Sequence, residues 1–361
     1  MRTARLSIVT PTRHSPHLMD RLYNSLFTQT CGEFEHILVD TSADDRTQER
    51  WWRDFAPHLD HRFHYARVHM YRPELAAAFE HAFAVASGEY VCPMTHKAMW
   101  RADAVENIHN ILDRFPTIHS FAFRSLYAPM DFHTNEGDFR EMRQFVFGSA
   151  WDGSDPIVYY SRATFLDNVR TFGESGYYGP HVESHYKSPF SSHALFSQKL
   201  LDRVRERFGS VVAGKFSGDS RAGYRIMDLE GEIYHFPNFE PRVSSTHVKT
   251  GAAGAQLHSW SYLCRAFETL SARTKREISC SPFGYLPLWE VMTCWELFSV
   301  AGEAQQHLAV PIEFDASSIM RNVVSEVHGL IDIEEPVRAG ILRHCEALAA
   351  RCEGGVVRKW F

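Results

Sequence analysis

Short apolar runs rich in β-branched residues alternate with longer segments of helical spacing over the first hundred residues. The runs that predict strands are Leu6–Thr10, Phe34–Asp40, Phe63–Met70 and Glu89–Cys92. Two segments that repeat apolar residues at helical spacing, Leu18–Thr30 and Glu74–Ser87, lie between them. We expect Pro11 to end the first strand. Strands separated by helices of this length predict a parallel sheet with crossover connections.

Polar residues gather where the predicted strands end. The three segments are Thr10–Thr12, Asp40–Ser42 and Pro93–Lys97. The carboxyl ends of parallel strands meet at one edge of a sheet, and the ligands of such sheets bind beyond that edge. These segments are therefore the first candidates for a binding site.

The pattern is mixed between residues 115 and 250. Short strands are predicted at Ser120–Leu126 and Pro156–Tyr160, and a helix at Ala194–Phe208. The glycine-rich segment Gly251–Gly254 then marks a boundary.

The chain after this boundary is mostly helical, as at Tyr262–Ile278 and Val337–Ala350. Apolar helix faces in this region allow either a wall of an acceptor cleft or a surface for homo-oligomers. The predicted units are residues 1–250, with halves 1–105 and 106–250, and a helical region at 255–361.

Composition narrows the class of protein. Hydrophobic residues make up 44% and charged residues 23% of 361 residues, which predicts a large buried core. No apolar run approaches the ~18 residues that a membrane span needs, and the start of the chain does not resemble a secretory signal. The seven cysteines are scattered without a C-x-x-C pair, so we expect reduced thiols and a cytoplasmic protein. The net charge of −6 argues against nucleic-acid partners, although a clustered basic surface would revive them.

Four segments of the N-terminal third together resemble a known family. They are Leu6–Thr12, Ser25–Thr30, Phe34–Ser42 and Ala86–Val91, the last followed by Trp100. Their order and spacing resemble family 2 glycosyltransferases. The resemblance implies a GT-A fold, which is an α/β nucleotide-diphosphate-sugar transferase fold with a Rossmann-like mixed sheet flanked by helices. It makes 1–105 the nucleotide-binding half and 106–250 the acceptor half, with the helical region appended.

The resemblance also implies a donor site at the carboxyl edge of the sheet. By position, Pro11 and Thr12 would line the base and ribose pocket, and Asp40 resembles the acidic residue that reads the base. A carboxylate suits this role because it accepts from an imide N–H or a ribose hydroxyl. The alternative is that Asp40 only caps a turn. The expected donor-binding residues are Thr10, Pro11, Thr12, Asp40, Ser42, Thr95, His96, Lys97, Arg242, His247 and Lys249.

The sequence departs from the family at the metal-binding motif. The family places Asp-x-Asp after the fourth strand to hold a divalent cation, whereas this chain has Thr95 and Lys97 at those positions. Mg²⁺ and Mn²⁺ require oxygen ligands, so we expect no metal cofactor here. In one interpretation Lys97 supplies the positive charge that stabilises the departing diphosphate, helped by His96 and the segment Arg242–Lys249. In the other, the donor site has decayed and the chain binds a nucleotide or partner without catalysis.

The acceptor side offers fewer signals. Inverting members need a carboxylate base to accept the proton of the acceptor hydroxyl. Glu183, between His181 and His185, is the best candidate base, and His181 is a candidate helper. If any metal binds, His181, Glu183 and His185 are its candidate ligands. An exposed polar loop is the simpler interpretation of this segment, and Asp152 and Asp155 follow as candidates for the base.

These patterns predict a glycosyltransferase that uses a nucleotide-diphosphate sugar as co-substrate. It would transfer the sugar to a hydroxyl or amine with inversion and without Mg²⁺ or Mn²⁺. The alternatives are a non-catalytic relative and a glycosyltransferase that acts on a large acceptor such as modified DNA. The sugar, the nucleotide and the acceptor do not follow from the sequence.

Overall fold

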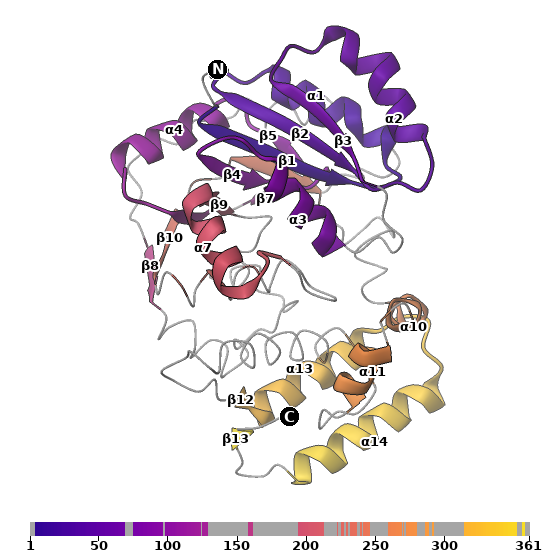
Figure 1. The fold of residues 1–361 in the computed structure, drawn as a ribbon. Helices are drawn as coiled ribbons and strands as arrows, with labels where there is room; N and C mark the ends of the chain where they lie inside the picture. Colours follow the sequence, from indigo (N-terminus) through magenta and orange to yellow (C-terminus); the bar gives the residue numbers. More distant parts are fainter. Residues whose placement is uncertain are drawn as a thin grey trace.

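The structure, a computed structural model, describes part of the chain. The described residues are 4–68, 75–96, 98–123, 125–128, 158–161, 194–212, 222, 225–226, 229, 232–236, 239, 241–245, 259–268, 270, 272–279, 286–288, 291, 314–351 and 356–357. They form an α/β part that holds the sheets and a helical part that follows it in the chain (Figure 1).

A mixed eight-stranded sheet organises the α/β part. Its strand order is β3-β2-β1-β4-β9-β6-β10-β8. The strands are β1 (Leu6–Thr12), β2 (Phe34–Asp40), β3 (Phe63–Arg67), β4 (Tyr90–Pro93), β6 (Ser120–Phe123), β8 (Val158–Ser161), β9 (Ala194–Ser197) and β10 (Glu232–Phe236). Strands β1 to β4 are parallel, whereas β9 runs antiparallel to both of its neighbours, β4 and β6. A parallel α/β arrangement is therefore confirmed for the N-terminal third.

Helices cover both faces of this sheet. They are α1 (Met19–Phe27), α2 (Arg46–Arg50), α3 (Leu75–Val85), α4 (Ala104–Arg114) and α7 (Gln198–Phe208). Short helices η1 (Pro16–Leu18), η2 (Trp51–Phe55) and η3 (Ala56–His58) flank α1 and α2. Alternation along β1 explains the two layers, because Leu6 and Ile8 pack with α1 and α4, and Val9 packs with α3 and α7.

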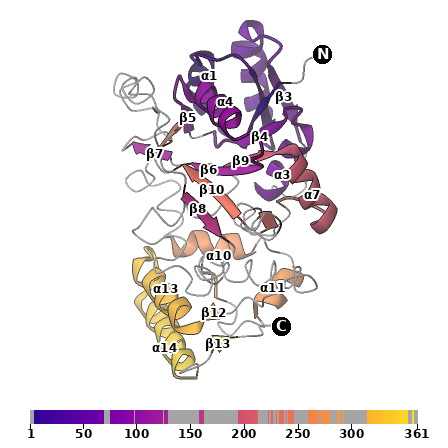
Figure 2. The ribbon, with the colours of Figure 1, turned by 90° about the vertical axis from the view of Figure 1, so that its left-hand side faces the viewer.

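A three-stranded sheet, β5-β11-β7, adjoins the main sheet beyond the end of β4 (Figure 2). Its strands are β5 (Ala98–Trp100), β7 (Ser125–Ala128) and β11 (Arg242–Ser245). Strand β11 pairs antiparallel with β5, so the backbone of Arg242 lies opposite Trp100. A segment from beyond residue 240 thereby returns to the chain that follows β4.

The C-terminal region is helical, as predicted, and lies below the α/β part in both views (Figures 1 and 2). Its elements are α10 (Trp260–Glu268), α11 (Ala272–Ser279), α13 (Ala316–Gly329), α14 (Glu335–Arg351), and the paired strands β12 (Phe314–Asp315) and β13 (Val356–Val357). Asp332, between α13 and α14, accepts hydrogen bonds from Trp260 N at 2.7 Å and Ser259 Oγ at 2.9 Å. This carboxylate connects the α13–α14 hairpin to the start of α10.

Three of the predicted elements were wrong in detail. Ala194–Ser197 is strand β9 and not the start of a helix, because its four buried residues pair with β4 and β6. The helix begins after Ser197, whose hydroxyl accepts from Leu200 N at 3.1 Å and caps it. The segment 262–278 is two helices, α10 and α11, and Ser120–Leu126 contributes to two strands in different sheets.

Pro11 does not end β1, which continues to Thr12. The last residue of β1 that pairs with β4 is Val9, so Pro11 pairs only with Val39 of β2. The missing N–H of Pro11 therefore costs nothing on the side of β4.

Candidate donor-binding site

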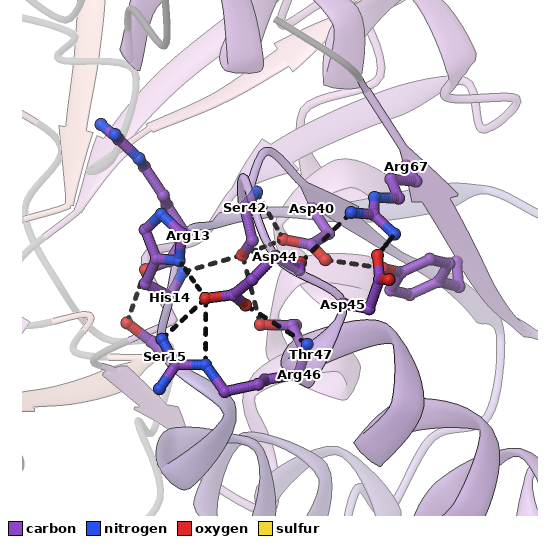
Figure 3. Close-up of polar contacts among 11 residues, drawn as sticks. Arg13, His14, Ser15, Asp40, Ser42, Asp44, Asp45, Arg46, Thr47 and Arg67 are labelled. Carbon is purple, nitrogen blue, oxygen red and sulfur yellow. Dashed lines mark hydrogen bonds and ion pairs between the residues drawn. The ribbon is translucent and has the colours of Figure 1, made fainter.

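Asp40, at the carboxyl end of β2, is the centre of a polar cluster at this edge of the sheet (Figure 3). Its carboxylate is fully buried. Oδ1 accepts hydrogen bonds from Ser42 N at 2.9 Å and Ser42 Oγ at 2.5 Å. Oδ2 accepts a hydrogen bond from the hydroxyl of Tyr65 at 2.6 Å. Both oxygens of Asp40 are thus engaged within the protein.

Tyr65 comes from β3, where its Cα pairs with that of Leu38. Burial and the hydrogen bond to Asp40 together raise the pKa of Tyr65 well above its usual value. The phenol therefore stays protonated and remains a donor to the carboxylate. This bond ties the end of β3 to the end of β2.

His14 forms the turn that follows β1. Its φ of 48° lies in the left-handed region, which is uncommon for a residue other than glycine. The backbone N–H of His14 donates to Ser42 Oγ at 2.8 Å, and Nδ1 of its ring lies 3.3 Å from Asp44 Oδ2. The polar cluster thereby holds the loop after β1 against the loop after β2, which explains how the unusual backbone conformation persists.

The other acidic side chains of this edge are paired with arginines. Arg46 donates to Asp44 through Nε at 3.0 Å and Nη2 at 2.7 Å, and these bonds lower the pKa of Asp44. Arg67 on β3 donates to the carboxylate of Asp45. The negative charges of the cluster are therefore largely compensated by the protein.

Two threonines of β1 contribute buried hydroxyls. Thr10 Oγ1 lies 3.1 Å from Nε2 of His36. Thr12 Oγ1 is buried and makes no hydrogen bond within the described part of the chain. A buried hydroxyl without a partner at a sheet edge is available to a ligand.

His96 joins the end of β4 to the end of β1. Its Nδ1 lies 3.1 Å from the carbonyl oxygen of Pro11, and Thr95 immediately precedes it. The segment where the family places its metal motif thus meets the loop after β1. The predicted residues that the structure brings to this edge are Thr10, Pro11, Thr12, Asp40, Ser42, Thr95 and His96, and the backbone of Arg242 lies on the adjoining β11.

Several predicted site residues lie outside the described residues. They are Lys97, Asp152, Asp155, His181, Glu183, His185, His247 and Lys249. Their roles stay predictions. Within the described ranges, no three histidine, cysteine or carboxylate side chains come together as a metal-binding group.

Sequence reasoning missed His14, Tyr65, Asp44 and the arginines that pair with the acidic residues. One feature of the sequence could have indicated Tyr65. It lies near the end of a predicted strand, and a tyrosine there can reach the last residue of the adjacent strand β2. The turn at His14 had none, because only the contact with Ser42 from another loop explains it.

The class of protein follows from the sheet and its polar edge together with a family comparison. Parallel strands in the order β3-β2-β1-β4, extended by antiparallel β9 and with polar side chains after β1, β2 and β4, have the GT-A arrangement of a glycosyltransferase. Residues 7–177 match the model described as glycosyl transferase family 2. The predicted resemblance, fold class and enzyme class are confirmed.

Solved structures that align with the chain are glycosyltransferases of low sequence identity. S. aureus TarS 1–349 in complex with UDP-GlcNAc shares 11% identity, with 97% of this chain and 92% of that chain covered and a TM-score of 0.46. The mannosyltransferase PcManGT from Pyrobaculum calidifontis, in complex with GDP-Man and Mn²⁺, shares 16% identity, with 98% and 88% covered and a TM-score of 0.45. Because both scores are below 0.5, the assignment rests on the family match and the strand order.

No curated protein matches the chain. Among the helices that the structure describes, none combines the length and the apolar character needed to span a membrane.

Proposed function

We propose that this protein transfers a sugar from a nucleotide-diphosphate donor to an acceptor hydroxyl or amine, with inversion and without Mg²⁺ or Mn²⁺. The observation that carries the proposal is the family match over residues 7–177, combined with Thr95 and His96 at the end of β4, where the family holds its metal. We also propose a cytoplasmic location, since the described cysteines Cys31, Cys92, Cys264 and Cys345 are free thiols.

The donor would lie across the ends of β1, β2 and β4. Ligands of open α/β sheets bind beyond the carboxyl ends of the strands, and the polar side chains of this protein gather there. Because Asp40 is buried and bonded through both oxygens, we assign it the role of a positioning residue. It holds Ser42, and through Ser42 the turn at His14, which would form the wall of the nucleotide pocket.

The side chains after β4 do not fit a divalent metal of the family's kind. Thr95 and His96 offer no carboxylate, and Nδ1 of His96 already lies at hydrogen-bonding distance from Pro11 O. The negative charge that develops on the leaving diphosphate would then be stabilised by fixed cations of the protein. Lys97 and Arg242 remain our candidates for two of them.

The transfer itself is a displacement at the anomeric carbon. The acceptor oxygen or nitrogen forms a bond to that carbon while the bond from the carbon to the diphosphate oxygen breaks. The acceptor's proton passes to a carboxylate base, for which Glu183 is our candidate, and the nucleoside diphosphate leaves with the electron pair of the broken bond.

A thermal-shift panel tests the proposal first. Each ligand is added with Mn²⁺ or with EDTA. The ligands are the nucleoside diphosphates UDP, GDP, ADP, CDP and dTDP and the nucleotide sugars UDP-GlcNAc and GDP-Man. Specific binding raises the melting temperature by mass action. We expect one nucleotide to raise the melting temperature in the presence of EDTA. We also expect the protein to cleave the corresponding nucleotide sugar slowly and to release the nucleoside diphosphate.

Three outcomes would count against the proposal. A shift that requires Mn²⁺ would contradict metal independence and direct attention to His181, Glu183 and His185. No shift with any nucleotide would contradict donor binding. Binding without release of nucleotide, in the presence of varied acceptors, would favour a non-catalytic relative.

A further inference from the structure

Arg13 is the exposed residue that follows β1 at the candidate donor site. We propose that Arg13 binds the diphosphate of the nucleotide donor through its guanidinium group. This inference rests on the proposed function and adds to it a residue that makes the site bind nucleoside diphosphates more tightly than uncharged nucleosides.

The arginines at this edge of the sheet differ in whether their charge is paired with a carboxylate. Arg46 is bound to Asp44 and Arg67 to Asp45, so their charges are compensated. The guanidinium of Arg13 makes no hydrogen bond or ion pair within the described part of the chain, and in Figure 3 it points away from Asp40, Ser42 and Asp44. Arg13 is thus an arginine of this edge whose charge remains available to an anion.

The backbone of Arg13 is held although its side chain is available. Its carbonyl oxygen accepts a hydrogen bond from Ser15 Oγ at 2.9 Å. The next residue, His14, has a φ of 48° and donates its N–H to Ser42 Oγ at 2.8 Å. These bonds keep the Cα of Arg13 in place, so that a ligand must order only the side chain.

The neighbouring groups fit an anionic ligand. Thr12, directly before Arg13, has a buried hydroxyl with no partner among the described residues. The acidic side chains nearby are neutralised by Arg46 or engaged by Tyr65 and Ser42, which reduces their repulsion of a phosphate. His96, bonded to Pro11 two residues before Arg13, brings the end of β4 to the same place.

The chemistry of the guanidinium matches a diphosphate. Its planar set of N–H donors carries a positive charge and can bind two phosphate oxygens at once. A cation at the end of β1 would therefore supply charge that the family takes from a metal after β4.

The test compares two ligands in four proteins. The ligands are the nucleoside diphosphate that gives the largest thermal shift and its nucleoside, measured by calorimetry and by ligand-observed NMR. The proteins are wild type, Arg13→Gln, Arg13→Lys and the control Arg53→Gln, which removes an exposed arginine paired with Asp54 on η2. Melting temperatures without ligand check that each variant is folded.

We expect Arg13→Gln to weaken diphosphate binding by about tenfold or more, and to leave nucleoside binding within about twofold of wild type. Arg13→Lys should fall between the two because it keeps the charge and loses the fork of donors. Arg53→Gln should bind both ligands as wild type does.

Two results would overturn the inference while leaving the proposed function intact. One is diphosphate binding by Arg13→Gln equal to wild type, and the other is an equal loss for diphosphate and nucleoside. If the wild-type protein binds no nucleotide, the proposed function fails and the role of Arg13 fails with it.

Discussion

The carboxylate of Asp40 carries three hydrogen bonds in a place that water does not reach. A buried charge is tolerated only when its hydrogen bonds are made, so the loss of any donor to Asp40 should destabilise the folded protein. Tyr65 is the donor that comes from another strand. Its hydroxyl therefore stabilises the folded protein and also holds Asp40 in place at the proposed pocket.

Replacing Tyr65 with phenylalanine tests this link. Tyr65→Phe should lower the free energy of unfolding by about 1–3 kcal/mol, because one oxygen of a buried carboxylate loses its partner. The matched control is Tyr90→Phe, which removes a 3.0 Å hydrogen bond to the neutral carbonyl of Ile118. Urea denaturation should show the larger loss for Tyr65→Phe. Equal losses would mean that the charge of Asp40 adds nothing to this bond.

At the scale of the elements, Gly88 lies at a close approach between β1 and the chain that leads from α3 into β4. A Cβ atom at Gly88 would lie 2.7 Å from both the N and the Oγ of Ser7. Ser7 Oγ in turn accepts a hydrogen bond from Gly88 N at 2.7 Å and donates to the buried carboxylate of Glu35. A side chain at residue 88 would separate these elements at the opposite end of the sheet from the donor site.

Gly88→Ala should accordingly destabilise the protein by about 1–3 kcal/mol, the usual cost of overpacking. Gly340→Ala is the control, because a Cβ there meets no atom within 4 Å and the residue lies in helix α14. That variant should be neutral or more stable by up to about 1 kcal/mol. Chemical denaturation measures both, and an unchanged stability of Gly88→Ala would contradict the close approach.

The elements also show which sequence patterns mislead. Ala194–Ser197 is a short apolar run directly before a helix, and it is a strand because it pairs with β4 on one side and β6 on the other. Alternation within a short apolar run cannot distinguish a buried strand from a helical turn. The partner strands, far away in the sequence, make the difference.

At the scale of the whole molecule, the buried histidine of β2 makes stability depend on pH. His36 is fully buried among Tyr23, Phe63 and Thr10. Burial, helped by the charge of His64, lowers the pKa of His36 to about 3. Between its ordinary pKa of about 6.5 and this value, the unfolded chain binds a proton that the folded chain does not. The folded state is therefore favoured fully above about pH 6.5 and progressively less as the pH falls towards 3.

His36→Phe should reduce this acid sensitivity, since phenylalanine keeps the ring and cannot take up a proton. Between pH 7.5 and pH 5, the free energy of unfolding should fall by about 2 kcal/mol less in the variant than in wild type. Urea denaturation at the two pH values gives the comparison, whatever the starting stability of the variant. The same fall in both proteins would show that His36 is not the source.

The division of the chain into a donor-binding part and a helical part stays a prediction. The described helices α13 and α14 pack against each other, and Asp332 ties their hairpin to α10.

Local patterns were enough to predict the parallel strands and the polar edge of the sheet. The strand Phe34–Asp40 has the same bounds in the pattern and in the structure, and the polar residues after β1, β2 and β4 meet as expected. These features depend on neighbouring residues, because burial, alternation and turn chemistry act over a few positions.

The contacts that define the site depend on residues far apart in the sequence. Asp40 could be placed at the end of its strand from the sequence, but its burial and its bond to Tyr65 require β3 to lie beside β2 in a particular register. The backbone of His14 needs Ser42, and the tertiary structure decides that Asp44 pairs with Arg46 and Asp45 with Arg67. Hydrogen bonds and ion pairs have a short range, so a change of one residue in register would give each of these side chains a different partner.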